Sequence, residues 1–269
     1  MWEAVISLGV SGLVIGVLLA VAANKFKVET DPKIPAIQSV LPGANCGVCG
    51  YPGCAGLAAA IVEGKAPVNA CKVGGDPVAE KVAGIVGISA QAVDSQVAVV
   101  YCQGDCTLAE SSAEYEGIAD CRAANAVGGS KTCAYGCLGL GSCVKACPFG
   151  AMYMNDKGLP VVIREKCTGC GLCVKACPRG VIGLVAADKE VHILCRSYDK
   201  GPVVRKYCKV GCIACQACVR ACPQKAISMD RGTLAKIAYD LCDNCGLCVT
   251  KCPVKTILSY GKKAESAAS

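Results

Sequence analysis

The chain has 269 residues and 25 cysteines, but only two Phe, one Trp and nine Tyr. So few aromatic side chains exclude a fold held together by an ordinary hydrophobic core alone. The odd number of cysteines and their repeated spacings also disfavour a framework of disulfides. The composition therefore favours metal clusters that serve as both core and cofactor, in a reducing compartment.

The formal net charge of +7 counts every cysteine as neutral. An oxidised 4Fe-4S cluster with four thiolate ligands is about 2 units negative, so five or six clusters would bring the net charge to about −3 or −5. The basic residues are scattered beside the cysteine runs instead of forming a basic tract with aromatic residues. Nucleic acid is therefore not an expected partner. Examples of these scattered residues are Lys175, Arg179, Arg220 and Lys251.

Residues 1–27 predict a transmembrane anchor. The run from Ala4 to Ala23 contains no charge over 20 positions, which as a helix of about 30 Å would cross a hydrocarbon layer. A cleaved signal peptide is the alternative, but the segment before the run lacks Lys and Arg. The excess of positive charge after the run predicts a single-pass protein of the cytoplasmic (inner) membrane, with the rest of the chain on the cytoplasmic side.

Residues 28–98 predict a small domain around one 4Fe-4S cluster. Thr30 to Val40 contains two prolines and predicts a short linker. Two short helices are expected, at 57–62 and 76–86. A Gly-rich loop supplies three cysteines and a fourth follows later, which suits the tetrahedral corners of a cubane. A structural zinc with four cysteines is the alternative. The expected ligands are Cys46, Cys49, Cys54 and Cys71.

The strongest signal is the run C-x2-C-x2-C-x3-C-P, which occurs three times. It matches the run of bacterial ferredoxins, in which three cysteines bind one cluster and the fourth binds the neighbouring cluster. A related, incomplete run precedes them, and the fourth cysteines Cys147 and Cys222 lie 75 residues apart. The sequence thus predicts two tandem 2×4Fe-4S ferredoxin modules, at 99–187 and 188–260. The complete runs start at Cys167, Cys212 and Cys242.

The pairing rule assigns three clusters completely. Each takes three cysteines from one run and the fourth from its partner run. The expected sets are Cys212, Cys215, Cys218 and Cys252; Cys242, Cys245, Cys248 and Cys222; and Cys167, Cys170, Cys173 and Cys147.

The first module has a second cluster position, built on the incomplete run, which we call the slot. It departs from the pairing rule, because Leu140 stands where the second cysteine of the run should be. This leaves Cys137, Cys143 and Cys177. Either Cys133 supplies the missing thiolate, or the slot holds a cluster with a non-cysteine ligand or with three irons. When the two modules are aligned, Cys133 corresponds to Cys208. The second module has all its cluster ligands without Cys208.

That alignment favours a separate, sixth site outside the ferredoxin slots. Its expected ligands are Cys102, Cys106, Cys121 and Cys133. The same alignment pairs Cys102 with Cys195. Cys195 and Cys208 are then expected to be buried, inert thiols.

Other chemistry is sparse. His192, the only histidine, lies in the strand-like segment 191–194 and is expected to be structural. We find no dinucleotide fingerprint, phosphate loop or catalytic motif. A chain of clusters moves single electrons but does not accept a hydride, so hydride chemistry must belong to a partner.

The order of these motifs resembles the B subunit of the Rnf complex. The resemblance rests on the apolar N-terminal segment, the motif from Leu41 to Cys54, the motif from Cys133 to Pro148, and the ferredoxin runs. It covers nearly the whole chain and implies an α+β protein with five to six 4Fe-4S clusters. Two modules resemble the longer form of the family expected in strict anaerobes. Residues 261–269 are expected to be a disordered tail.

The resemblance also implies a function. A protein of this family takes electrons from reduced ferredoxin and passes them to other subunits of a membrane-bound, ion-translocating ferredoxin:NAD oxidoreductase. A stand-alone, membrane-anchored polyferredoxin that distributes electrons is the alternative. The segments Thr30–Val40 and Ile88–Gln96 would let the N-terminal cluster domain move between partners.

Overall fold

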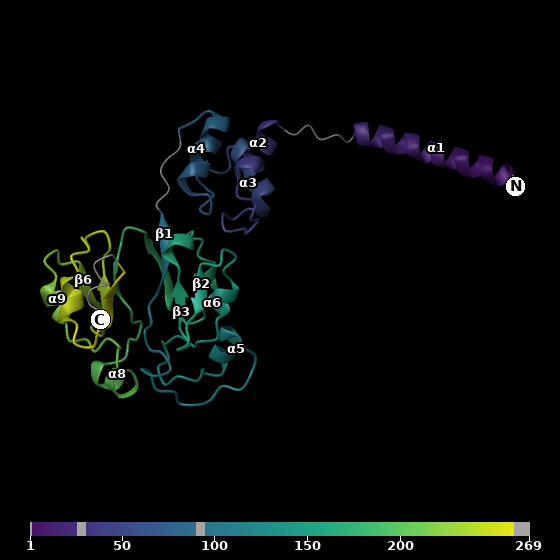
Figure 1. Ribbon diagram of the computed structural model, residues 1–269. Helices are drawn as coiled ribbons and strands as arrows, with labels where there is room; N and C mark the ends of the chain where they lie inside the picture. Colours follow the sequence, from purple (N-terminus) through teal and green to yellow (C-terminus); the bar gives the residue numbers. More distant parts are fainter. Residues whose placement is uncertain (1, 26–30, 90–94, 261–269) are drawn as a thin grey trace.

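The computed structural model describes residues 2–25, 31–89 and 95–260, and the predicted tail at 261–269 lies outside this range. The first helix, α1 (Trp2–Lys25), projects away from the remainder of the chain (Figure 1). Among the residues that the structure describes, no helix meets both the length and the apolarity required of a membrane span.

Three helices form the N-terminal domain: α2 (Lys33–Val40), α3 (Gly53–Val62) and α4 (Gly75–Val86). Ile37, Leu57 and Val82, one from each helix, are at most 1% exposed and form the centre of its core. The helices expected at 57–62 and 76–86 are thus confirmed, each with an earlier start.

The linker predicted at 30–40 is wrong for most of its length, because α2 occupies Lys33–Val40. Pro35 lies in the first turn, where a helix does not need its missing N–H. Asp31 accepts a hydrogen bond from the backbone N–H of Lys33 at 2.8 Å and so satisfies one free donor of this turn. Burial of Ile37 then fixes the helix to the domain.

The next unit contains two antiparallel strand pairs. Strand β1 (Gln96–Val100) pairs with β4 (Ile182–Ala186), and β2 (Met152–Met154) pairs with β3 (Pro160–Val162). Its helical segments are α5 (Cys121–Ala126), α6 (Ser142–Lys145), η1 (Arg164–Lys166) and α7 (Leu172–Ala176). Because β1 starts at Gln96, this module begins before the predicted boundary at residue 99.

The last unit repeats this plan. Strand β5 (Val191–Ile193) pairs with β8 (Ile257–Ser259), and β6 (Ile227–Asp230) pairs with β7 (Leu234–Ile237). Its helices are α8 (Gly201–Tyr207), α9 (Ala217–Ala221) and α10 (Leu247–Lys251). In both units the first strand pairs with the last, so the internal repeat of the sequence is a repeat of structure.

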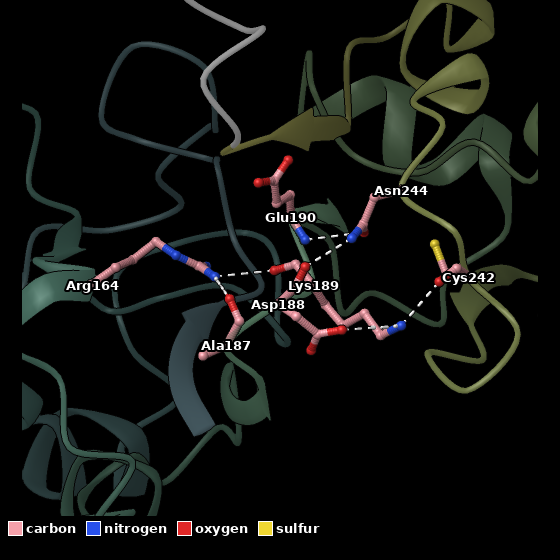
Figure 2. Close-up of polar contacts among 7 residues, drawn as sticks. All are labelled: Arg164, Ala187, Asp188, Lys189, Glu190, Cys242 and Asn244. Atoms are coloured by element: carbon pink, nitrogen blue, oxygen red, sulfur yellow. Dashed lines mark hydrogen bonds and ion pairs between the residues drawn. The ribbon is translucent and has the colours of Figure 1, made fainter. Parts of the chain in front are cut away.

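The two units contact each other directly. Val97 and Val185 of the first unit share a buried cluster with Leu194 of the second. The connection at 187–190 is held from both sides, as Figure 2 shows. Arg164 donates to the carbonyls of Ala187 (3.0 Å) and Lys189 (3.1 Å).

From the second unit, the Asn244 amide donates to the carbonyl of Asp188 at 2.8 Å and accepts from the N–H of Glu190 at 3.1 Å (Figure 2). The ammonium of Lys189 donates to the carbonyl of Cys242 at 3.0 Å. The modules are therefore joined by a short connection that is hydrogen-bonded to both of them.

Candidate functional site

Three of the four expected thiols of the N-terminal domain, those of Cys49, Cys54 and Cys71, lie close together beside the core of its helices. The backbone N–H of Cys54 donates to the side-chain oxygen of Asn45 at 2.8 Å, which shapes the loop before the helix. A Cβ at Gly53 would come within 2.8 Å of that oxygen, so the close approach requires glycine. Burial raises the pKa of Cys71, and the nearby Cys54 and Cys49 raise it further.

The second module holds its two sets on equivalent loops. Helices α9 and α10 each follow a residue with a left-handed backbone, Gln216 and Gly246, and each carries its third cysteine in the first turn. Burial raises the pKa of Cys218 to about 11, and Cys212, Cys215 and Cys252 contribute. Burial raises the pKa of Cys248 to about 11 as well, and Cys218, Cys242 and Cys245 add to it.

The first module gathers one further set in the same way. Burial raises the pKa of Cys173 to about 11, and the charges of Cys167, Cys170 and Cys147 act in the same direction. The backbone N–H of Ala98 in β1 donates to the sulfur of Cys167 at 3.4 Å. For two of the three sets that the pairing rule assigns, all four thiols thus lie close together, and for the third Cys242, Cys245 and Cys248 do.

The slot with Leu140 receives a fourth thiol from an unexpected residue. One cavity is lined by the four cysteines Cys121, Cys137, Cys143 and Cys177. Burial raises the pKa of Cys143 to about 12, with further contributions from Cys137, Cys121 and Cys177. Leu140 does not line this cavity, so Cys121 replaces the second cysteine of the run in space and not in sequence.

Two hydrogen bonds fix Cys121 at this position. Its backbone N–H donates to the hydroxyl of Ser142 at 2.8 Å, and that hydroxyl donates to Asp120 at 3.0 Å. Asp120 caps α5 by accepting from the N–H groups of Arg122 and Ala123. The start of α5 is thereby attached to the residue that precedes Cys143.

The set predicted for the sixth site is not brought together. Cys102 and Cys133 line a second cavity, together with Cys195 and Cys208 of the second module. Cys121 belongs to the slot described above, and Cys106 is exposed. The physical reason is that the segment between Cys102 and Cys121 runs from this second cavity to the slot, where Asp120 and Ser142 tie Cys121 to α6.

Sequence reasoning thus missed the positions of Cys121, Cys195 and Cys208. For Cys195 and Cys208 a signal was present, because the repeat aligns them with Cys102 and Cys133. For Cys121 there is no such signal. Its place depends on the fold of a segment that the second module lacks.

One basic residue, Arg179, lies beside both cavities. It donates to the carbonyls of Cys133 (2.9 Å), Gly136 (3.1 Å) and Gly128 (2.6 Å). Burial lowers its pKa, and the thiols of Cys133 and Cys137, which lie close to it, act against this shift. Arg179 therefore stands between the two cavities and can offset negative charge in both.

The donor sets fit 4Fe-4S clusters. Each offers four thiols, the ligand set that such clusters share with structural zinc. Because the pKa values of the buried thiols are raised, they stay protonated at pH 7, and binding iron must release protons. In the described part of the chain, no three or more Cys, His, Asp or Glu side chains are arranged to hold a single metal ion.

His192 takes no part in these sets. It is fully buried in β5, the strand expected at this position, and its Nδ1 lies 2.8 Å from the hydroxyl of Tyr239. Burial lowers its pKa to about 4, and the positive charge of Arg164 adds to the shift. The geometry agrees with the structural role expected for this residue.

Three family models match the chain. A model described as a putative Fe-S cluster matches residues 41–73. Two models described as 4Fe-4S dicluster domains match residues 132–182 and 211–256. These ranges cover the N-terminal set and the runs of both modules.

Curated relatives match over most of the chain. The B subunit of the Na+-translocating ferredoxin:NAD+ oxidoreductase complex of Acetobacterium woodii is 50% identical, over 95% of this chain and 78% of the relative. The B subunit of the ion-translocating oxidoreductase complex of Methanosarcina acetivorans is 45% identical, over 91% and 93%. The B subunit of the proton-translocating ferredoxin:NAD+ oxidoreductase complex of Clostridium ljungdahlii is 48% identical, over 92% and 89%.

Proposed function

The chain belongs to the family of Rnf complex B subunits, and on this premise we propose how it works within such a complex. It is an iron–sulfur electron-transfer subunit of an ion-translocating ferredoxin:NAD oxidoreductase complex. We propose that it accepts electrons from reduced ferredoxin and passes them to other subunits. The observation that supports this best is that several groups of four thiols lie close together and that the groups within each module are neighbours.

We propose that five of these sets hold 4Fe-4S clusters. When bound, such clusters supply one-electron redox chemistry. The protein holds the irons, donates backbone hydrogen bonds to sulfur and excludes water. The five sets are Cys46, Cys49, Cys54 and Cys71; Cys147, Cys167, Cys170 and Cys173; Cys121, Cys137, Cys143 and Cys177; Cys212, Cys215, Cys218 and Cys252; and Cys222, Cys242, Cys245 and Cys248.

The sets within each module are neighbours. The charge of Cys173 reaches Cys143 in the other set of the first module, and that of Cys218 reaches Cys248 in the second. Residues 72–77 of the N-terminal domain line one cleft with Thr168 and Gly169, which lie within the run of the first module. This adjacency supports a route from the N-terminal domain into the first module.

We propose that residues 1–27 anchor the chain in the cytoplasmic membrane, with the cysteine domains on the cytoplasmic side. The uncharged run from Ala4 to Ala23 and the positive residues after it support this orientation. Many of the described apolar side chains of α1 are exposed, for example Leu13 (70%) and Leu19 (65%). Lipid or a partner helix would cover them in a complex.

The donor is tested by mixing the anaerobically purified, full-length chain with reduced ferredoxin and following the visible absorbance of the clusters. We expect stoichiometric bleaching. In membranes that carry the complex, replacing Cys248 by Ala should abolish ferredoxin-dependent NAD reduction, whereas replacing the exposed Cys106 by Ala should not. A chain that reduced ferredoxin leaves oxidised would overturn the proposal.

The stand-alone polyferredoxin is the second candidate. It predicts that the solubilised chain purifies without other subunits and that its loss leaves NAD reduction by membranes unchanged. Co-purification with further subunits, together with loss of that activity, supports the role within the complex instead.

A further inference from the structure

The cavity between the two modules contains four cysteines that the ferredoxin pairing rule does not use. Cys102 and Cys133 come from the first module, and Cys195 and Cys208 come from the second. The space between protein atoms, open solvent at the cavity mouth included, is about 410 Å³ here and about 370 Å³ in the slot lined by Cys121, Cys137, Cys143 and Cys177. The interface cavity therefore matches a ferredoxin-type slot in both size and thiol content.

We propose that Cys102, Cys133, Cys195 and Cys208 hold a sixth 4Fe-4S cluster, shared between the two modules. The proposal deepens the electron-transfer function above and rests on it for its purpose. We call this set the interface site. Backbone hydrogen bonds, a buried cation, the shape of the cavity and the internal repeat each support it.

Every thiol of the interface site accepts a backbone hydrogen bond. The N–H of Cys137 donates to Cys102 at 3.4 Å, and that of Tyr135 donates to Cys133. Cys195 accepts from the N–H groups of Ser197 and Cys212, and Cys208 from those of Val210 and Gly211. Such N–H donors to sulfur stabilise a thiolate and tune an iron–sulfur site.

The pattern of these bonds repeats that of the expected sites. In Cys133, Cys195 and Cys208 the donor lies two residues after the cysteine. The same relation holds for Cys71 with Val73 and for Cys137 with Gly139. An inert buried thiol needs no such donor, because the sulfur of an S–H group is a weak acceptor.

A buried cation points to negative charge in this cavity. Lys131 is only 9% exposed, lines the cavity and donates to the carbonyl of Gly104. Within the described part of the chain, no carboxylate forms an ion pair with it. A buried ammonium without a counter-charge is costly, and four thiolates around a cluster would supply that charge.

Three glycines line the cavity close to the cysteine sulfurs, where a cluster would bind. A Cβ on Gly104 would lie 3.4 Å from the sulfur of Cys208, and a Cβ on Gly136 would lie 3.5 Å from that of Cys133. A Cβ on Gly211 would lie 3.5 Å from the sulfur of Cys208 and would collide with Val204. These glycines leave the sulfurs uncovered on the side of the cavity.

The repeat gives an independent argument. Cys102 and Cys195 occupy equivalent positions in the two modules, and so do Cys133 and Cys208. Each module therefore contributes the same pair of thiols to the interface site. Cysteines without a function are not expected at both equivalent positions of each module, with all four lining one cavity between the modules.

The interface site lies between the cluster sites of the two modules, so a cluster there would connect them. Cys102 contacts the slot of the first module through the N–H of Cys137, and Cys195 contacts the second module through the N–H of Cys212. A redox group held here would join two pairs of clusters that otherwise end at the module boundary. All cysteines except Cys106 then belong to one of six sets of four.

Iron and acid-labile sulfide in the anaerobically purified, full-length chain test this site without any activity assay. The wild-type chain should contain about 24 irons, the content of six 4Fe-4S clusters. Replacing Cys208 by Ala should remove about four irons, or about one if a three-iron cluster with its own paramagnetic signal remains. Replacing Cys106 by Ala, the matched control, should remove none. A wild-type content of about 20 irons, or zinc in place of the sixth cluster, would overturn the proposal.

Double variants separate a shared site from general damage to the fold. Cys195→Ala combined with Cys208→Ala should lose no more than one cluster, because both residues serve the same one. Cys121→Ala combined with Cys208→Ala should lose two. If Cys208→Ala leaves iron, sulfide and the spectrum unchanged, the site does not exist. Failure of NAD reduction with six clusters present would count against the proposed function and leave the interface site intact.

Discussion

The backbone N–H of Cys137 donates a hydrogen bond to the sulfur of Cys102 at 3.4 Å. Cys137 belongs to the slot of the first module, and Cys102 belongs to the interface site. One peptide group thus connects the two thiol sets, and displacement of either loop would disturb the other. Burial and the nearby Cys102 raise the pKa of Cys137 to about 11, which reflects the same closeness.

Replacing Cys121 by Ala should remove one cluster, about four irons, or leave a three-iron cluster in its place. The reason is that Cys121 lines the slot with Cys137, Cys143 and Cys177, whereas Leu140 does not. Leu140→Ala is the control and should keep the full iron content. Iron and sulfide analysis with electron paramagnetic resonance of the oxidised protein measures both. Full iron content in the Cys121 variant would show that another residue completes the slot.

The sequence assigns three sets of four because the spacing within a run and the crossing of its fourth cysteine to the partner run are fixed by the motif. It predicts α3 and α4 from their local sequence, with later starts than the structure has. It predicts a linker where α2 lies, because Pro32 and Pro35 are typical of linkers. What it could not predict is which cysteines meet across the module interface. Cys195 and Cys208 meet Cys102 and Cys133 only because the modules pack against each other, and spacing contains no information on that packing.

Replacing Arg164 by Met should loosen the joint between the modules. The guanidinium donates to the carbonyls of Ala187 and Lys189, and both would lose their partner (Figure 2). We expect the free energy of unfolding to fall by about 1–3 kcal/mol and amide exchange at 187–190 to rise. Lys166→Met, an exposed neighbour on the same short helix, should change stability by less than about 0.5 kcal/mol. Equal effects of both variants would argue against a role of Arg164 in the joint.

His192 should make the second module less stable in mild acid. Burial, with the charge of Arg164, lowers its pKa to about 4 in the folded chain, against about 6.5 when unfolded. Stability is therefore fully present above pH 6.5. This stability is lost as the pH falls toward 4, because His192 then binds a proton in the unfolded chain but not in the folded chain. The loss should be on the order of 2 kcal/mol.

Denaturant unfolding followed by circular dichroism between pH 7 and pH 5 measures this loss. His192→Asn supplies a neutral amide for the hydroxyl of Tyr239 and should be less stable at pH 7 but lose less stability on acidification. If wild type and variant lose stability in parallel, another group is responsible for the pH dependence.

Replacing Arg179 by Gln should lower the reduction potential of the clusters on either side of it by tens of millivolts. Its guanidinium lies near Cys133, Cys137 and Cys177, and a positive charge stabilises the reduced, more negative state of a cluster. Redox titration followed by electron paramagnetic resonance measures the shift. Arg122→Gln, which removes an exposed charge on α5, should shift the potential much less because water and salt screen it.

Arg179→Lys separates charge from shape at this position. The ammonium keeps the positive charge, so the potential should stay near that of the wild type. It cannot reproduce the fork that reaches the carbonyls of Gly128, Cys133 and Gly136, so stability should fall as it does in the Gln variant. A potential that falls equally in the Lys and Gln variants would mean that loop geometry, and not charge, sets it.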